Sequence, residues 1–266
     1  MNAGIGRQLE RAKAELRALT GQAVPDVVAL FRAASGEPDP WQTEALRSTA
    51  QRLALNVTRQ GGKSSVAAAK ACHAALSEPD SLVLVVSPSL RQSGELFRKV
   101  LDCYGAAGRP VSPDSETKLT LELANGRRVV SLPGKEGTVR GYSGVRLLLI
   151  DEASRVPSEL YYSVRPMLAV SAGRIVTLST PFGRIGWWAD AWHSDEPWER
   201  YEVPAEHGPR IPHSFLDEER RSMPEWFYRQ EYGCQFMEAV DAVFRTDDIA
   251  AALSHEVTPL FGMGAA

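Results

Sequence analysis

Short, wholly apolar runs alternate along this chain with longer segments whose apolar residues recur every three or four positions. The short runs predict strands that are buried on both faces. They lie at 53–58, 81–86, 145–151 and 174–179. The longer segments predict helices over 63–77 and about 90–104. Such strands, separated by helices, are typical of an α/β fold in which helices flank a mostly parallel sheet.

Two further strands form a predicted hairpin. Residues 118–123 alternate apolar and polar side chains, and Asn125-Gly126 separates them from a second run at 127–132. An Asn-Gly pair between two such runs is a strong signal for a tight hairpin turn. Further upstream, a proline-rich turn precedes a helix that we expect to begin at Trp41.

The pattern changes after Gly183, where periodicity weakens and Trp, Pro and acidic residues become frequent. We expect a small helical lid there, including a helix over 224–236. Near the other end, residues 5–19 carry an apolar stripe at helical spacing, which either docks on the chain's own core or binds a partner. The predicted organisation is an N-terminal helical segment, a core, a lid and a tail, over 1–35, 36–200, 201–250 and 251–266.

Composition narrows the class of protein only a little. With 266 residues, 44% apolar and 24% charged, the chain is long enough for a full hydrophobic core and ordinary for a soluble protein. It has neither an apolar run long enough to span a membrane nor a secretory signal, so we expect it in the cytoplasm. Three scattered cysteines without Cys-x-x-Cys spacing predict buried, reduced thiols.

The charge is unevenly distributed. The net charge of −3 gives no sign of a nucleic-acid binder, although the middle of the chain is basic and the region near the C-terminus is acidic. This asymmetry either steers a polyanion to one face or reflects the solvated faces of a mixed surface, so charge alone decides neither.

The segment that carries most information is Arg59-Gln60-Gly61-Gly62-Lys63-Ser64, followed by Ser65, between a predicted strand and an alanine-rich helix. A helix entered through a glycine turn directs free N–H groups and its positive dipole end at one point, which suits a phosphate. Lysine then reaches the β- and γ-phosphates, and Ser64 takes a Mg²⁺ position. The segment departs from the common phosphate-loop pattern, because Val57 replaces the first glycine and Arg59 lies inside the turn.

A second chemical feature ends the strand at 145–151. Asp151 and Glu152 follow an apolar run, where a metal ligand and a base for water are needed. We expect Asp151 to hold Mg²⁺, through water, and Glu152 to orient and deprotonate the attacking water. The alternative is a carboxylate pair that merely caps the following helix. Together with the glycine turn, the pair predicts nucleoside triphosphate hydrolysis.

Several other side chains are candidates for the same site. Arg140, in a glycine-rich segment, either reaches the γ-phosphate on a neighbouring subunit or is a surface or DNA-facing arginine. Arg59 either senses the γ-phosphate or pairs with a carboxylate. Gln42 either hydrogen-bonds an adenine edge or belongs to an ordinary helix start. Ser179 and Thr180, at the end of a strand, either link hydrolysis to motion or cap that strand.

These residues resemble the ATPase domain of large terminase subunits, the motors that package DNA into tailed-phage capsids. The resemblance covers about 40–245. Its motifs are Pro40-Trp41-Gln42, Arg59 to Ser64, Arg140-Gly141 ahead of Leu147 to Glu152, Leu178 to Pro181, Glu231 to Phe236, and Val243-Phe244. The arginine and glutamine in the phosphate loop (Walker A) are the most specific of these features, whereas the Asp-Glu (Walker B) and Ser-Thr motifs are shared with helicases.

The resemblance implies a RecA-like (ASCE) P-loop core with a lid, and ATP hydrolysis coupled to translocation of double-stranded DNA into a procapsid. It implies Gln42 at adenine, Lys63 and Ser64 at phosphate and Mg²⁺, Asp151 and Glu152 as the acidic pair, Ser179-Thr180 as coupling motif and Arg140 as trans-acting arginine finger. The implied partners are the portal protein and the small terminase subunit, in a homo-oligomeric ring that is monomeric when dilute, in the host cytoplasm.

The family usually carries a metal-dependent nuclease domain after the ATPase domain, and this chain shows no such carboxylate cluster. We therefore expect either an isolated ATPase domain or a protein without the nuclease, and DNA cutting is not predicted. Residues 118–128 or 134–141 are candidates for gripping DNA.

Two rival functions remain. A helicase-like DNA-dependent ATPase needs a second RecA-like lobe, for which 181–266 looks too short and irregular. A non-hydrolysing nucleotide-binding assembly subunit would not need all four of Lys63, Ser64, Asp151 and Glu152.

Overall fold

A single sheet organises the computed structural model, which describes residues 24–134 and 141–238. The sheet has eight strands in the order β3-β4-β5-β2-β6-β7-β1-β8. Their bounds are β1 Arg52–Val57, β2 Leu82–Ser87, β3 Pro113–Glu116, β4 Thr120–Leu123, β5 Arg128–Pro133, β6 Val145–Asp151, β7 Arg174–Ser179 and β8 Glu199–Val203. Six neighbouring strands of this order, β5-β2-β6-β7-β1-β8, pair in parallel, which confirms the predicted mostly parallel sheet.

The remaining two strands are antiparallel extensions at one edge. β4 pairs antiparallel with both β3 and β5, and the predicted Asn125-Gly126 turn joins β4 to β5. Gly126 has φ of +83°, the left-handed conformation that such a turn requires. The hairpin prediction is therefore confirmed, while β3 was not predicted.

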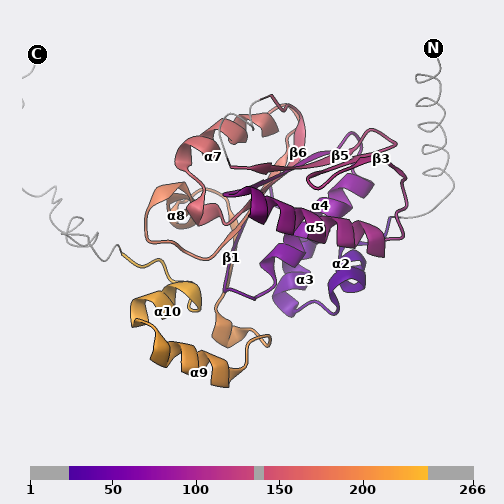
Figure 1. The fold of residues 1–266 in the computed structure, drawn as a ribbon. Helices are drawn as coiled ribbons and strands as arrows, with labels where there is room; N and C mark the ends of the chain where they lie inside the picture. The colour runs from indigo at the N-terminus through magenta and orange to yellow at the C-terminus, as the bar shows by residue number, and fades with distance from the viewer. Residues whose placement is uncertain (1–23, 135–140, 239–266) are drawn as a thin grey trace, which may run out of the picture.

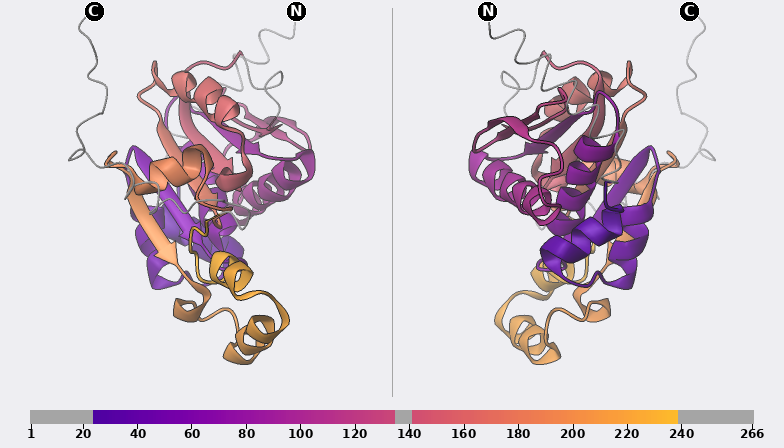
Figure 2. Two further views of the ribbon diagram at one scale, coloured as in Figure 1. Left: turned by 90° about the vertical axis from the view of Figure 1, so that its left-hand side faces the viewer. Right: turned by 90° about the vertical axis from the view of Figure 1, so that its right-hand side faces the viewer.

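Helices cover both faces of the sheet (Figures 1 and 2). One layer packs against alternate residues of the strands, including Leu55, Val85 and Leu149, and contains α2 Val27–Ser35, α3 Pro40–Arg47, α4 Lys63–Ser77 and α5 Leu90–Ala106. The opposite face, including Leu84 and Ile150, packs against α7 Ser158–Val164 and α8 Gly186–His193. Strands covered on both faces explain why their sequences are continuously apolar.

Tryptophans belong to the second of these layers. Trp187, Trp188 and Trp198 are buried with residues of the main sheet, and Trp187 stacks on Tyr161 with ring centroids 3.9 Å apart. They are therefore core residues of the principal sheet. The cysteines Cys72, Cys103 and Cys234 are buried and free, as predicted.

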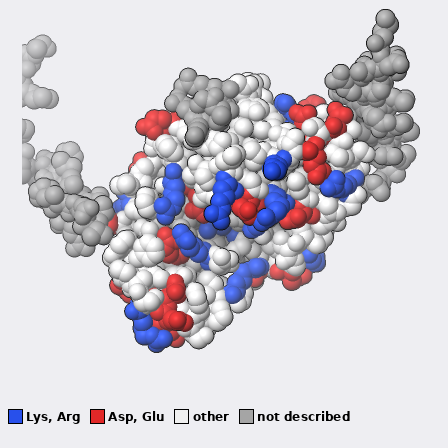
Figure 3. All heavy atoms as spheres, in the orientation of Figure 1, with Lys and Arg blue, Asp and Glu red and all other residues white. Residues whose placement is uncertain are grey.

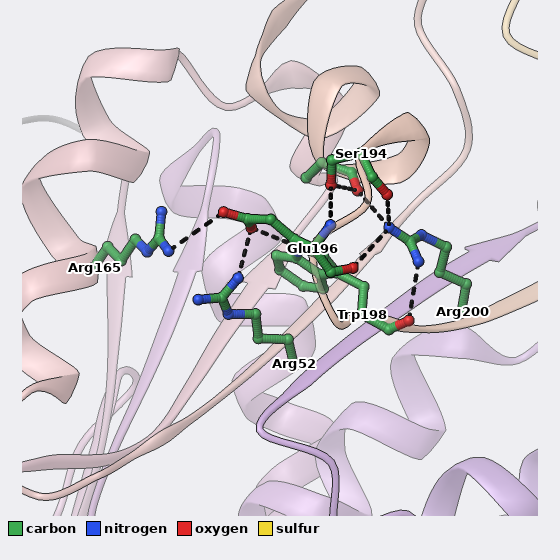
Figure 4. A network of polar contacts seen from close by, with 7 residues as sticks. Arg52, Arg165, Ser194, Glu196, Trp198 and Arg200 are labelled. Atoms are coloured by element: carbon green, nitrogen blue, oxygen red, sulfur yellow. Dashed lines mark hydrogen bonds and ion pairs between the residues drawn. The ribbon is translucent and has the colours of Figure 1, made fainter.

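The strand β8 is fixed to the sheet by a polar network on the side of the sheet where β1 begins (Figure 4). Glu196 accepts a hydrogen bond from Arg52, the first residue of β1, at 2.6 Å, and from the indole of Trp198 at 3.3 Å. The Arg165 guanidinium lies 3.8 Å from the same carboxylate. Arg200 donates to a backbone carbonyl of α8 and to backbone carbonyls of the loop between α8 and β8. This network closes the end of the core opposite to the phosphate loop.

A small helical unit follows β8, seen as the orange and yellow helices in Figure 1. It comprises the 3₁₀ turn Ala205–His207, α9 His213–Ser222 and α10 Glu225–Glu231, and we call it the lid. The helix predicted over 224–236 is wrong in length. The helix ends at Glu231 because Cys234 takes a left-handed conformation, with φ of +57°. The Cys234 carbonyl accepts a 2.7 Å hydrogen bond from the Asn56 side chain of β1.

The predicted boundary between core and lid, at residue 200, falls inside β8. The division into segments 1–35, 36–200, 201–250 and 251–266 stays a prediction, and much of the first and all of the last lie outside the described residues. None of the helices in the described ranges combines the length and the apolar character that a bilayer crossing requires.

Candidate nucleotide-binding site

The loop between β1 and α4 is the centre of the site. Gly61 donates its N–H to the carbonyl of Thr58 at 3.2 Å, and Gly62 caps α4 in a left-handed conformation, with φ of +89°. Lys63 is the first residue of α4, and its Nζ folds back to within 3.4 Å of the Val57 carbonyl. A lysine and free helix N–H groups thus meet at one point, which is the arrangement that binds phosphate.

Gly62 is required by this geometry, and Gly62→Ala is expected to distort it. A Cβ there would clash with Nε2 of buried Gln42, and left-handed backbone costs a non-glycine residue about 1–2 kcal/mol. We expect lower stability by about that amount or more, measured by urea denaturation.

Gly94→Ala is the matched control, because a Cβ at this helical glycine meets no atom within 4 Å. It is expected to be neutral or stabilising by about 0.5–1 kcal/mol. Equal effects of the two substitutions would contradict the role given to Gly62.

The acidic pair lies at the end of β6, and its second member, Glu152, faces the same cavity. Glu152 has a left-handed backbone, with φ of +48°, and begins the turn η1, Ala153–Arg155. It lines a polar cavity of about 520 Å³ together with Lys63, Ser64 and Ser65. A non-glycine residue in this conformation is uncommon, and such residues concentrate at functional sites. The structure therefore places the glycine turn and Glu152 around one cavity, whereas Asp151 is not among the residues that line it.

Asp151 is buried beside Glu152, and its Oδ1 has no hydrogen-bond partner. Burial, and after it the charge of Glu152, raises the pKa of Asp151 to about 6, although the charge of Lys63 opposes both effects. A buried carboxylate oxygen without a donor suits a cation ligand. Ser64 lines the cavity, so Ser64 and Asp151 fit the two protein positions of a Mg²⁺ site. No group of three or more His, Cys, Asp or Glu residues suitable for a metal occurs in the described part of the chain.

Gln42 lies beside the glycine turn, fully buried, near the N-terminus of α3. Its Oε1 accepts hydrogen bonds from the Asp39 N–H at 2.9 Å and from Nη2 of Arg210 at 3.0 Å, whereas its Nε2 has no partner. Lys70 of α4 holds the other end of α3 by donating to the carbonyls of Ala45, Leu46 and Ser48. Burial lowers the pKa of Lys70 to about 8.

The lid reaches the phosphate loop through Glu231, whose side chain is only 2% exposed. Its Oε2 accepts a hydrogen bond from Nε of Arg59 at 2.5 Å, and its backbone carbonyl accepts one from the Thr58 hydroxyl at 3.2 Å. Of the two alternatives for Arg59, the structure contains the pairing with a carboxylate. The γ-phosphate role of Arg59 stays a prediction.

The last residue of β7, Ser179, contacts the segment that follows Glu152. The Ser179 hydroxyl donates to the Thr180 carbonyl at 2.7 Å and accepts from the Ser154 N–H at 3.2 Å. The Ser154 and Ser179 hydroxyl oxygens are 2.8 Å apart. Both Ser179 and Thr180 are buried. They are therefore placed next to the acidic pair, although their coupling role is untested.

Sequence reasoning missed four residues that line the cavity. Gln92 and Lys99 are seven residues apart on α5, so helical periodicity could have placed them on one face. Arg155 and Arg210 also line it, and Arg210 of the lid has no sequence signal. Basic side chains form a band across the face that carries α5 (Figure 3). Predicted Arg140 lies outside the described residues.

A strand, glycine turn and helix presenting Lys63, opposite a strand-end acidic pair on a parallel sheet, define a P-loop nucleoside triphosphatase fold of the RecA-like class. Comparison with known proteins identifies the family within this class. Residues 55–251 match the family described as "Terminase large subunit, T4likevirus-type, N-terminal". This chain belongs to that family.

Similar proteins agree with the family match. The terminase large subunits of Thermus phage G20c and Thermus virus P23-45 are each 25% identical over 260 residues, covering 83% of this chain and 53% of the relative. The chain thus spans about half the length of the curated relatives it matches.

Solved structures resemble the fold. The large terminase ATPase domain of Thermus phage P74-26 has a TM-score of 0.69 at 21% identity, covering 78% of this chain and 97% of that one. The HK97 bacteriophage large terminase has a TM-score of 0.64 at 16% identity, covering 79% and 54%. The large terminase of a thermophilic bacteriophage, solved in complex with ADP, has a TM-score of 0.62 at 11% identity, covering 75% and 54%.

Proposed function

We propose that this chain is the ATP-hydrolysing motor domain of a DNA-packaging terminase, which couples ATP turnover to movement of double-stranded DNA into a procapsid. The observation that carries the proposal is that Lys63 and Glu152, far apart in sequence, line one polar cavity. Family membership supports the terminase assignment, and the similar terminase from the thermophilic bacteriophage was solved with ADP and with ATP-γ-S.

The phosphate loop binds the nucleotide in this proposal. Backbone N–H groups of Gly62, Lys63 and Ser64, at the glycine turn and the N-terminus of α4, surround the phosphates, and Lys63 leaves the Val57 carbonyl to reach the β- and γ-phosphates. The buried Gln42 amide next to Gly62 contacts the adenine edge. Positive charge from Arg59 and Lys63 in the cavity balances the triphosphate.

Mg²⁺ would be held by the hydroxyl of Ser64 and by Asp151, whose Oδ1 lacks a donor. When bound, the ion neutralises charge on the phosphate oxygens. Glu152 accepts the proton of the attacking water, for which its carboxylate lines the cavity. Arg140 of a neighbouring subunit, or Arg59, supplies the arginine finger.

The partners follow from the family and not from contacts. We propose double-stranded DNA, the portal protein and the small terminase subunit, with a homo-oligomeric ring in which Arg140 acts in trans. Ser179 and Thr180 would couple hydrolysis to motion, since Ser179 contacts the segment after Glu152 and Thr180 is the next residue. Assembly of virions places this machinery in the host cytoplasm.

Phosphate release at high protein concentration, with double-stranded DNA and Mg²⁺, tests the proposed activity. A high concentration is needed because a trans-acting arginine requires the assembled ring. Absence of phosphate release from the wild-type protein, while it still binds ATP-γ-S, would overturn hydrolysis and favour a nucleotide-binding assembly subunit.

Lys63→Ala is expected to weaken ATP-γ-S binding about tenfold or more, because a charge-assisted contact to phosphate contributes about 1.5–3 kcal/mol. Isothermal titration calorimetry measures the affinity. Lys118→Ala, at an exposed residue of the hairpin region, is the control and should bind as the wild type does. Unchanged affinity of the Lys63 variant would remove this lysine from the phosphate site.

A further inference from the structure

Arg155 lies where three parts of the protein meet. It is the last residue of η1, three positions after Glu152, and it lines the same cavity as Lys63 and Ser64. Its guanidinium lies 4.1 Å from the ring centroid of Phe182 and its Nη2 lies 3.9 Å from Oε1 of Glu231 in the lid. One side chain therefore touches the cavity wall, the loop after β7 and the lid.

The guanidinium of Arg155 keeps its hydrogen-bonding capacity. An arginine has five N–H donors in a fork that matches phosphate oxygens. No residue in the described ranges accepts a hydrogen bond from the Arg155 guanidinium, and 3.9 Å from its Nη2 to Oε1 of Glu231 is too long for one. Arg59 differs, because its Nε already donates to the same carboxylate at 2.5 Å. Of the two arginines that share Glu231, Arg155 is the one whose guanidinium makes no hydrogen bond to that carboxylate, so it can turn to a ligand without breaking one.

The position of Arg155 specifies which part of a nucleotide it meets. In the proposed nucleotide complex Gln42 contacts the base, and Arg210 is hydrogen-bonded to Gln42, whereas Glu152 must lie beyond the last phosphate to act on an attacking water. Arg155 comes from the Glu152 wall of the cavity. A guanidinium on that wall reaches the terminal phosphate and not the base.

Contacts also join Arg155 to the elements that would move. Its neighbour Ser154 is hydrogen-bonded to Ser179, and Arg155 itself lies over Phe182. The next residue, Gly183, donates its N–H to Oε1 of Gln230 at 3.1 Å, and Gln230 precedes Glu231 in α10. These contacts connect the cavity, through the loop 179–183, to the lid.

We infer that Arg155 binds the terminal phosphate of the triphosphate and transmits its presence to the loop 179–183 and the lid. The inference rests on the proposed function and adds a residue to it. In the triphosphate complex the Arg155 guanidinium donates to oxygens of the terminal phosphate and leaves Glu231. In the diphosphate complex these acceptors are gone and Arg155 returns to its place between Phe182 and Glu231.

Paired titrations with ATP-γ-S and ADP test the binding step. Arg155→Gln is expected to weaken ATP-γ-S at least tenfold while ADP affinity stays within twofold of the wild type. Arg155→Lys keeps the positive charge but not the forked guanidinium, so its affinity for ATP-γ-S should lie between those of the wild type and Arg155→Gln. Arg184→Gln is the matched control, an exposed arginine two residues after Phe182 that is absent from the cavity, and should change neither affinity.

Hydrogen exchange with full-length wild type and Arg155→Gln tests transmission. In the wild type, ATP-γ-S but not ADP should change exchange of the 180–183 and 225–231 amides, and in the variant this difference should vanish at saturating nucleotide. Phe182→Leu removes the stacked ring and should keep ATP-γ-S affinity within twofold while reducing the exchange difference.

The outcomes separate this inference from the proposed function. If the wild type fails to bind ATP-γ-S, the nucleotide site itself is refuted. If the wild type binds and Arg155→Gln weakens both nucleotides equally or neither, Arg155 has no terminal-phosphate role. If the exchange difference persists in Arg155→Gln at saturation, the transmission step is overturned. Thermal melting of each variant identifies a loss that comes from unfolding.

Discussion

Glu152→Gln is expected to lower the rate of ATP turnover by about 10²–10⁴-fold, the usual contribution of a general base. The substitution preserves size and hydrogen-bonding atoms but cannot accept a proton from water. Nucleotide affinity should change little, because phosphate is held by the opposite wall of the cavity, at Lys63 and Ser64. Steady-state phosphate release beside an ATP-γ-S titration measures the two quantities separately.

Glu159→Gln provides the control for this experiment. Glu159 is an exposed residue in the first turn of α7, close in sequence to Glu152 but absent from the cavity lining. Its variant should hydrolyse ATP as the wild type does. Turnover above a tenth of the wild-type rate in Glu152→Gln would remove Glu152 as the base, whatever the affinity shows.

Asp151→Asn should have opposite effects on stability and activity. Folding raises the pKa of Asp151 from 3.8 to about 6, first because the carboxyl is buried and second because Glu152 is adjacent. The folded state therefore binds this proton more tightly than the unfolded state. Its stabilising effect is complete below pH 3.8 and is lost as pH rises through about 6. At pH 7.5 the ionised carboxylate costs the nucleotide-free protein about 2–3 kcal/mol.

An uncharged amide removes that cost. We expect the unfolding free energy of Asp151→Asn at pH 7.5 to exceed that of the wild type by up to about 2–3 kcal/mol, and the difference to shrink toward pH 4. Mg²⁺-dependent turnover should fall at least about 10²-fold, because loss of a metal ligand removes several kcal/mol of charge stabilisation. Urea denaturation across pH and phosphate-release assays provide the two measurements.

Asp114→Asn, at an exposed position of β3, should leave both quantities unchanged. If Asp151→Asn is less stable than the wild type at pH 7.5, other groups in the folded protein stabilise the ionised carboxylate. The unpartnered Oδ1 then does not lower the unfolding free energy. Full activity would exclude Asp151 from metal binding.

The parallel core was predictable because its signals are local. β6 and β7 begin and end where the apolar runs do, and α4 spans the residues predicted for it. β8 escaped prediction because it is an edge strand with mostly polar, partly exposed residues, so its sequence lacks the apolar run of a central strand. Only its pairing with β1 makes it a strand.

The sequence by itself determined the phosphate loop and the acidic strand end, since a strand, a glycine turn and a helix start are specified by adjacent residues. Their meeting follows from parallel strands, whose carboxyl ends share one edge of the sheet. The tertiary structure decided the rest. The contacts Arg59–Glu231 and Arg210–Gln42 join residues 172 and 168 positions apart, and Arg155 gained Phe182 only through the packing of η1 beside β7. The sequence around a charged residue does not indicate which residue it will pair with, because the fold of the intervening chain determines which charged side chains come together.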